Sequence, residues 1–250
     1  MSSEMETLPK LCDHRNSIFL AFFLNLMSKK LLGHFEQVYV LGLEKAQQVC
    51  QVHGAVFAPN HIAYWDSALF VLLSSKISPN AFVFMDADNL KQYSFLKWCG
   101  VLPLESKIPR VAIQQLQNLH HLHKQTTQFW IFPQGKQQPS HVRPLGFKKG
   151  VGILARSLDI PIIPMSIQYL YKDAYEKPFA YVCFHNPLPS DSKVRDIEEA
   201  VHQGLQSIDE HILYNRENLY QQMFPKTTTD SIDLPSRILT YIADLMMQRN

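Results

Sequence analysis

The sequence has almost no net charge, because its 24 lysines and arginines are nearly balanced by 22 aspartates and glutamates, for a formal charge of +2 over 250 residues. Nucleic-acid-binding proteins usually carry a strong basic excess, so we expect no nucleic-acid partner. Hydrophobic residues make up 46% of the chain and charged residues only 18%, which excludes a disordered tail. The length suits one α/β domain or two small ones.

Cysteine is scarce, and no two cysteines stand at a short spacing. The four are Cys12, Cys50, Cys99 and Cys183. Without a C-x-x-C pair, the sequence offers neither a zinc ribbon nor a disulfide framework, so we expect reduced thiols in a cytosolic protein. The motif Gly-x-Ser-x-Gly is also missing, which argues against a serine hydrolase of the nucleophile-elbow type.

A long hydrophobic run is missing as well. The apolar stretch at residues 17–27 reaches only about half of the ~20 residues that cross a bilayer. Its lysines, Lys29 and Lys30, follow the run, whereas a signal peptide has its positive charge before the run and a cleavage site after it. Two interpretations remain from composition: a buried helix, or a helix lying in a membrane interface with its lysines at the lipid head groups.

The chain is rich in aromatic residues, with 15 Phe, 10 Tyr and 3 Trp, and much of it alternates between strand-like and helix-like segments. This alternation predicts an α/β fold with a mixed, partly parallel sheet flanked by helices. The predicted strands are residues 38–41, 55–58, 81–85, 129–132, 160–167 and 181–184. The predicted helices between them are residues 67–75, 111–125 and 151–158.

The C-terminal quarter is helical in pattern. Apolar residues recur at steps of three and four from Val194 to Ile212, which predicts an amphipathic helix, and a second helix is expected at residues 237–248. No internal repeat or low-complexity linker divides the chain. We therefore expect a single domain with an N-terminal apolar segment at 1–35, an α/β core at 36–190 and a helical extension at 191–250.

The first chemical motif is Asn60-His61-x4-Asp66, between a predicted strand and a predicted helix. Residues five apart on a regular helix differ by about 140°, so the segment after the strand must form a turn that brings the carboxylate back to the imidazole. A histidine oriented in this way is a general base for a hydroxyl. A His–Asp pair at this spacing also arises by chance in a chain with 11 histidines.

The second motif follows the strand at 129–132 and reads Phe132-Pro-Gln134-Gly135-Lys136. Gly135 permits a positive φ or a close backbone approach. Lys136 and Arg143, with Lys148 and Lys149, form a basic stretch that can bind a phosphate. Taken alone, the same stretch is more typical of a solvated loop.

Together these blocks resemble the glycerolipid acyltransferases of the lysophosphatidate acyltransferase (PlsC-like) family over roughly residues 40–190. Asn60-His61-x4-Asp66 resembles the first block of the family, and Phe132-Pro-Gln134-Gly135 its third block. Gly100-Val-Leu-Pro103 through Lys107 and Arg110 is similar to the second block. The stretches Phe147-Lys-Lys-Gly150 and Ile160-Pro-Ile-Ile-Pro164 are similar to the segments that follow.

The resemblance implies direct acyl transfer to a lipid hydroxyl. His61 would deprotonate the acceptor, Asp66 would orient the imidazole, and the donor would be acyl-CoA or acyl carrier protein, with no further cofactor and no metal. It also implies substrate contacts by the following residues: Asn60, Lys107, Arg110, Gln134, Gly135, Lys136 and Arg143. A location at the cytoplasmic face of a membrane is implied too, which favours the interfacial interpretation of residues 18–32.

The third block departs from the usual Phe-Pro-Glu-Gly-Thr-Arg, because Gln134 replaces the Glu, Lys136 the Thr and Gln137 the Arg. A glutamine cannot bind phosphate bidentately as arginine does. The acceptor is therefore left open between lysophosphatidate and another lysolipid, a glycosylated lipid or another lipid-linked hydroxyl. The altered block also leaves open an alternative, a lipid-binding or scaffold protein that has lost catalysis.

Two further patterns carry less weight. His120-His121-Leu-His123 has no carboxylate or cysteine at ligand spacing, so we interpret it as the solvated face of the helix predicted there. Gly150-x-Gly152-x-x-Ala155 imitates a dinucleotide fingerprint but does not follow a strand.

Overall fold

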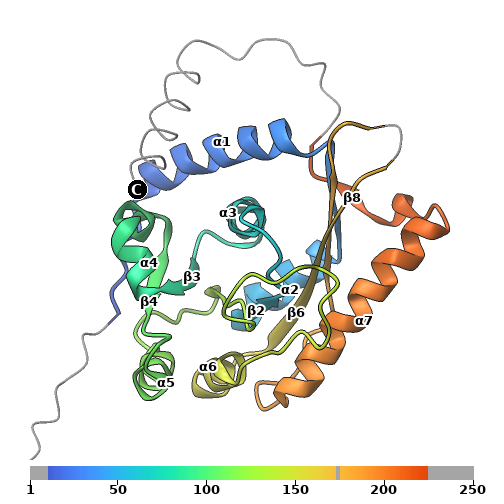
Figure 1. The fold of residues 1–250 in the computed structure, drawn as a ribbon. Helices are drawn as coiled ribbons and strands as arrows, with labels where there is room; N and C mark the ends of the chain where they lie inside the picture. Colours follow the sequence, from blue (N-terminus) through green and yellow to red (C-terminus); the bar gives the residue numbers. More distant parts are fainter. Residues whose placement is uncertain (1–10, 173–174, 225–250) are drawn as a thin grey trace, which may run out of the picture.

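The computed structural model describes residues 11–172 and 175–224, which form a mixed eight-stranded sheet with helices on both faces (Figure 1). The strands lie in the order β4-β3-β5-β2-β6-β7-β1-β8. Their bounds are β1 Gln37–Leu41, β2 Ala55–Pro59, β3 Ala81–Asp86, β4 Val101–Leu104, β5 Gln128–Trp130, β6 Ile162–Leu170, β7 Phe179–Phe184 and β8 Gln221–Gln222.

The five strands from β4 to β6 run parallel, and the direction reverses at β7, which is antiparallel to β6. Strand β1 is parallel to β7, and the short β8 is antiparallel to β1. This arrangement confirms the predicted mixed, partly parallel sheet. Because parallel strands end at the same edge, the loops after β2, β3, β4 and β5 meet there, where α/β folds place their binding sites.

Helices cover both faces of this sheet. Their bounds are α1 Ser17–His34, α2 Leu43–His53, α3 Trp65–Ile77, α4 Ala87–Gln92, α5 Pro109–Gln117, α6 Gly150–Leu158 and α7 Val194–Leu213, with short 3₁₀ turns η1 at Ser94–Cys99 and η2 at Glu217–Leu219. Every residue of β2 is buried, as expected of a central strand with helices on either side.

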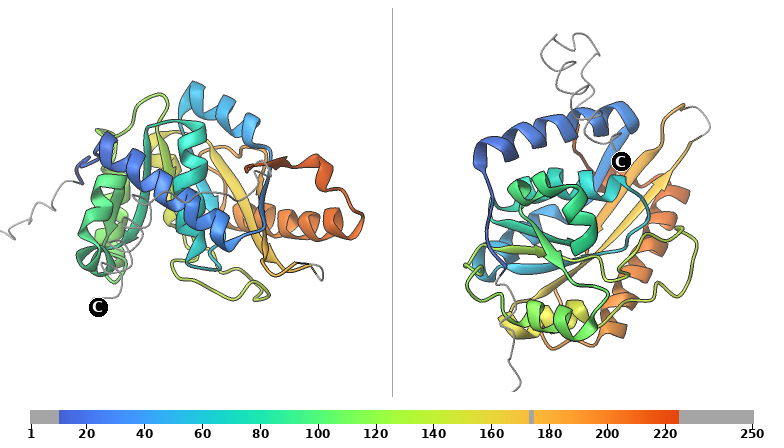
Figure 2. Two further views of the ribbon diagram at one scale, coloured as in Figure 1. Left: turned by 90° about the horizontal axis from the view of Figure 1, so that it is seen from above. Right: turned by 60° about the vertical axis from the view of Figure 1, so that its left-hand side comes forward.

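Two main cores lie on opposite faces of the sheet. One joins α1, α2 and α3 to the strands through residues such as Leu31, Leu69 and Leu73. The other joins α5 and α6 through residues such as Leu116 and Leu154, and it includes Ile197 of α7. Figure 2 shows α1 lying along the outer side of α3, so this face of the molecule has two helical layers.

Helix α1 begins at the cap residue Asn16, whose side-chain oxygen accepts the backbone N–H groups of Ile18 and Phe19. Its second half packs into the core through Leu26, Met27 and Leu31. Its first half is different, since Ile18 is 82% exposed. Of the described helices, none is long and apolar enough to cross a membrane.

Several sequence predictions need correction. The helix predicted at 111–125 ends at Gln117, and the next ten residues form turns, one of them fixed by the backbone N–H of Lys124 donating to the Thr127 hydroxyl at 2.7 Å. Elements α2, α4, η1, β4 and β8 were not predicted. The amphipathic helix predicted from 194 to 212 is confirmed as α7. The helix predicted at 237–248 lies outside the described residues.

Candidate active site

The turn between β2 and α3 is built around the carboxylate of Asp66. Its Oδ2 accepts the backbone N–H groups of Ile62 at 2.7 Å and Ala63 at 3.0 Å. The Asp66 side chain is completely buried, and a buried carboxylate is stable only when its oxygens are paired with donors. Formation of this turn therefore fixes the carboxylate before any substrate arrives.

His61 lies against this carboxylate, with 2.7 Å between its Nδ1 and Oδ2 of Asp66. An ionised carboxylate can only accept hydrogen bonds, so the imidazole proton is on Nδ1 and the lone pair is on Nε2. The ring of Phe132 packs on the imidazole with 4.3 Å between ring centroids, which shields it from water on that side. The His61 side chain keeps 17% exposure. The turn geometry predicted from the spacing is confirmed.

The backbone of His61 is held by the loop that follows β5. The side-chain oxygen of Gln134 accepts the N–H of His61 at 2.5 Å, and the N–H of Gln138 donates to the carbonyl of His61 at 2.9 Å. Gly135 closes the turn between them at φ +71°, and a side chain there would meet the end of Lys148. The first and third sequence blocks therefore form one structural unit.

Asn60 and Gln134 are buried beside the site and bond to the backbone around it. Asn60 is 1% exposed, and its amide both accepts the N–H of Ile167 at 2.7 Å and donates to the carbonyl of Ile167 at 2.9 Å. Gln134 is 2% exposed and bonded to His61. Although the sequence predicted substrate contacts for both, the structure pairs both side chains with the backbone of the protein itself, because buried amides must find partners there.

The remaining candidates of the third block are exposed. Lys136 follows Gly135 directly, and Arg143 donates to the carbonyls of Ser140 at 2.7 Å and Val142 at 2.8 Å. Both belong to the long loop between β5 and α6 (Figure 1). Lys148 reaches back toward Gly135. The loop thus carries positive charge close to the turn that holds His61.

The second block lies farther from His61. Lys107 precedes α5 and Arg110 is in its first turn, both beyond β4 at the end of the sheet order. Three strand spacings separate β4 from β2, or about 14 Å. Lys107 pairs with Asp88 at 2.7 Å, and Lys107 and Lys91 together lower the pKa of Asp88 to about 2. The positive charge of Lys107 is therefore partly neutralised.

Sequence reasoning missed one residue that touches the His–Asp pair. Tyr169 lies near the end of β6, where it pairs with Ala180 of β7, and its hydroxyl donates to Oδ1 of Asp66 at 2.5 Å. It is 103 residues from Asp66 along the chain and belongs to none of the blocks quoted above. Only the pairing of β6 with β2 brings it to the site, so no local pattern indicated it.

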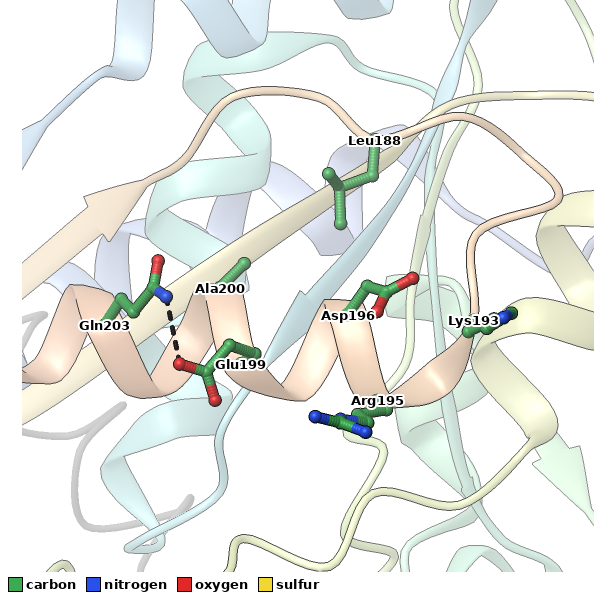
Figure 3. Close-up of a pocket in the computed structure, with 7 residues that line it drawn as sticks. All are labelled: Leu188, Lys193, Arg195, Asp196, Glu199, Ala200 and Gln203. Carbon is green, nitrogen blue, oxygen red and sulfur yellow. Dashed lines mark hydrogen bonds between the residues drawn. The ribbon is translucent and has the colours of Figure 1, made fainter.

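Within residues 11–172 and 175–224, no group of three or more His, Cys, Asp or Glu side chains is placed to hold a metal ion. The histidine run lies in turns after α5 and not on the helix predicted for it, and His121 Nε2 contacts the carbonyl of Leu11 at 2.6 Å. A hollow between Leu188 and the first turns of α7 is lined by side chains of both charges (Figure 3). It includes none of the candidate site residues.

The Acyltransferase family model matches residues 37–168, from β1 through most of β6. The chain belongs to this family. The matched region includes the His61–Asp66 pair, the second-block residues and the loop after β5, so the residues brought together by the fold lie within the family's own domain, with Tyr169 one position beyond it.

Two proteins of known activity are similar to parts of this chain. It is 30% identical over 112 residues to 1-acyl-sn-glycerol-3-phosphate acyltransferase of Saccharomyces cerevisiae, a stretch that spans 42% of this chain and 37% of the yeast protein. Its fold is similar to the crystal structure of the 1-acyl-sn-glycerophosphate acyltransferase PlsC from Thermotoga maritima, with a TM-score of 0.56 and 18% identity, over 76% of this chain and 79% of that one.

Proposed function

We propose that this protein transfers a fatty acyl group from an acyl thioester to the hydroxyl of a lysophospholipid or a related lipid. The donor is acyl-CoA or acyl carrier protein. The observation that supports the proposal best is the His61–Asp66 pair, because it leaves Nε2 of a half-buried imidazole with its lone pair available, inside an acyltransferase domain. No further cofactor is needed for this reaction.

The chemistry follows from that geometry. His61 Nε2 takes the proton of the acceptor hydroxyl while the oxygen attacks the thioester carbonyl. The tetrahedral intermediate then expels the thiolate, which recovers the proton from the imidazolium. Asp66 stabilises the imidazolium while it exists. The acyl carbon exchanges a sulfur for an oxygen, and no acyl-enzyme forms.

The acceptor carries a phosphate in the relatives' names, and the exposed cations around the site support a phosphate here too. Lys136 and Arg143 are on the loop that holds His61, while Lys107 and Arg110 lie at the edge of the sheet. Lys107 already pairs with Asp88, so the loop cations are the stronger candidates for an anionic head group.

The changed third block does not argue for a protein that has lost catalysis. The oxygen of Gln134 accepts the N–H of His61, and an amide oxygen does this as well as a carboxylate oxygen. With both His61 and Asp66 in place, the enzyme is the better proposal.

The test is acyl transfer by His61→Ala with radiolabelled acyl-CoA and a panel of lysolipids. General-base removal typically costs 10²- to 10⁴-fold, so the rate should fall by about that factor while the melting temperature stays within a few degrees. His120→Ala is the matched control, since His120 is an exposed histidine in the turns after α5, and it should keep the full rate. Full activity of His61→Ala would refute the proposal.

A further inference from the structure

We propose that Tyr169 is a positioning residue for acyl transfer, its hydroxyl holding the carboxylate of Asp66 in the orientation that keeps His61 ready to accept a proton. This inference rests on the proposed function and deepens it, because it adds a third member to the His–Asp pair, Tyr169, which lies one position beyond the family's matched region.

The two oxygens of Asp66 have different tasks. Oδ2 accepts the N–H groups of Ile62 and Ala63 and faces Nδ1 of His61, so it is already crowded with three donors. Among the described residues, Oδ1 has one recorded donor, the hydroxyl of Tyr169 at 2.5 Å. Because the side chain of Asp66 is completely buried, loss of that donor would leave one carboxylate oxygen without a partner.

Tyr169 is itself fixed through both its backbone and its ring. Asn60 bonds both backbone groups of Ile167, two residues earlier on the same face of β6, and this fixes the register that brings Tyr169 above Asp66. The ring of Tyr169 packs on Phe35 with 5.0 Å between centroids. Phe35 is buried and also contacts the ring of Trp65, the first residue of α3. The packing of the ring therefore determines the direction in which the hydroxyl of Tyr169 points.

The hydroxyl of Tyr169 remains protonated, and therefore a donor, at neutral pH. Burial raises the pKa of Tyr169 well above its usual value, and the neighbouring charge of Asp66 raises it further. Other titratable groups reach this cluster from α1 and α3. His34 stacks on Trp65 at 4.1 Å, and burial together with Lys177 lowers the pKa of His34, while Tyr64 is exposed beside Trp65.

Tyr169→Phe keeps the ring packing and removes only the hydrogen bond. We expect kcat to fall about tenfold or more with little change in either KM, because binding surfaces are untouched while the pair loses its orientation. The carboxylate would then direct more of its charge at the imidazole and favour the imidazolium. The pH of half-maximal activity on the acidic side should therefore rise by about one unit.

The matched control is Tyr220→Phe. Tyr220 is a buried tyrosine whose hydroxyl contacts Nδ1 of His211 at 3.0 Å in a separate cluster against α7. This control should lose stability but keep the wild-type kcat and pH profile. An equal loss of kcat in both variants, or an unshifted profile in Tyr169→Phe, would overturn the proposal.

A second measurement does not depend on activity. The proton between His61 Nδ1 and Asp66 should give a downfield ¹H NMR resonance that is absent in His61→Gln. Tyr169→Phe should shift it, whereas Tyr220→Phe should not. A wild-type protein that transfers no acyl group would refute the proposed function, whereas an unshifted resonance in an active Tyr169→Phe variant would refute only the role of Tyr169.

Discussion

Three polar side chains hold the His61–Asp66 pair in place, two by bonding to it directly and one by fixing a neighbouring strand. Gln134 bonds the backbone of His61, Tyr169 bonds the carboxylate of Asp66, and Asn60 fixes the strand that carries Tyr169. A buried donor or acceptor left without its partner costs about 1–3 kcal/mol. Each of these side chains therefore raises the free energy of other positions of the His61–Asp66 pair. The site is in this way organised before its substrate binds.

Gln134 provides a prediction at this scale. Gln134→Leu removes the acceptor of the His61 N–H and should lower kcat about tenfold or more, whereas Gln134→Glu keeps an acceptor oxygen and should stay within a few-fold of wild type. The measurement is the rate of acyl transfer at saturating donor and acceptor, with thermal unfolding of each variant alongside.

The matched control for this pair is Gln37→Leu. Gln37 is a buried glutamine whose oxygen accepts the N–H of Val38 at 2.9 Å on β1, three strands from β2. It should lose stability without losing kcat. Equal kcat losses at both glutamines would mean that Gln134 supports the fold in general and not His61.

At the scale of elements, local patterns predicted the strands that matter to the site and missed what depends on distant pairing. The spacing of His61 and Asp66 was sufficient to predict the turn after β2, because five residues between a buried strand and a helix allow few paths. The contact of Tyr169 with Asp66 could not be predicted from the sequence, since it depends on the register of β6 against β2. Strand β4, four residues with a proline, has too weak a pattern to be recognised.

The composition of helix α1 left a buried and an interfacial interpretation open, because the helix is apolar on most of its surface, and the family resemblance favoured the interfacial one. The structure divides it: Leu31 is fully buried, whereas Ile18 is 82% exposed. Near Ile18 the ring of Phe19 packs on Phe95 and Trp98 of η1, and Trp98 is itself half exposed. An exposed apolar patch with an aromatic rim is typical of a surface that inserts shallowly into lipid.

We therefore predict that Ile18→Asp weakens binding to vesicles of phosphatidylcholine and phosphatidylglycerol about tenfold or more, since a charge replaces an apolar side chain that lipid would bury. Sedimentation with vesicles measures it. Leu213→Asp is the control, because Leu213 is 72% exposed at the end of α7 and should not affect binding. Unchanged binding of Ile18→Asp would exclude this end of α1 as the membrane contact.

At the scale of the whole molecule, α7 is attached to the sheet through Ser166, whose hydroxyl also contacts a half-buried histidine, His185. The Ser166 hydroxyl donates to the carbonyl of Val201 at 2.8 Å, so its oxygen accepts from Nε2 of His185 at 2.7 Å. The helix comes so close here that a side chain at Gly204 would overlap the ring of His185. Burial lowers the pKa of His185 to about 4.

This histidine and three thiols predict a stability maximum near neutral pH. Since unfolded His185 takes up a proton near pH 6.5 and the folded form only near 4, the unfolded state binds more protons between them. Stability should therefore fall by about 3 kcal/mol as the pH drops through that window. Burial raises the pKa of Cys50 and Cys99 to about 12 and of Cys183 to about 11, so stability should fall again above pH 9.

Urea unfolding at a series of pH values measures both limbs. His185→Gln retains a donor for Ser166 but cannot take up a proton, so it should remove most of the fall between pH 6.5 and 4 and leave the alkaline limb unchanged. The fall that remains comes from His34 and His123, whose pKa values burial also lowers. His120→Gln, at an exposed position, should keep the full acidic fall. An acidic fall as large in His185→Gln as in the wild type would contradict this role of His185, because Asp86 and Asp88, whose pKa values are lowered in the folded protein, lose stabilising charge only near and below pH 4.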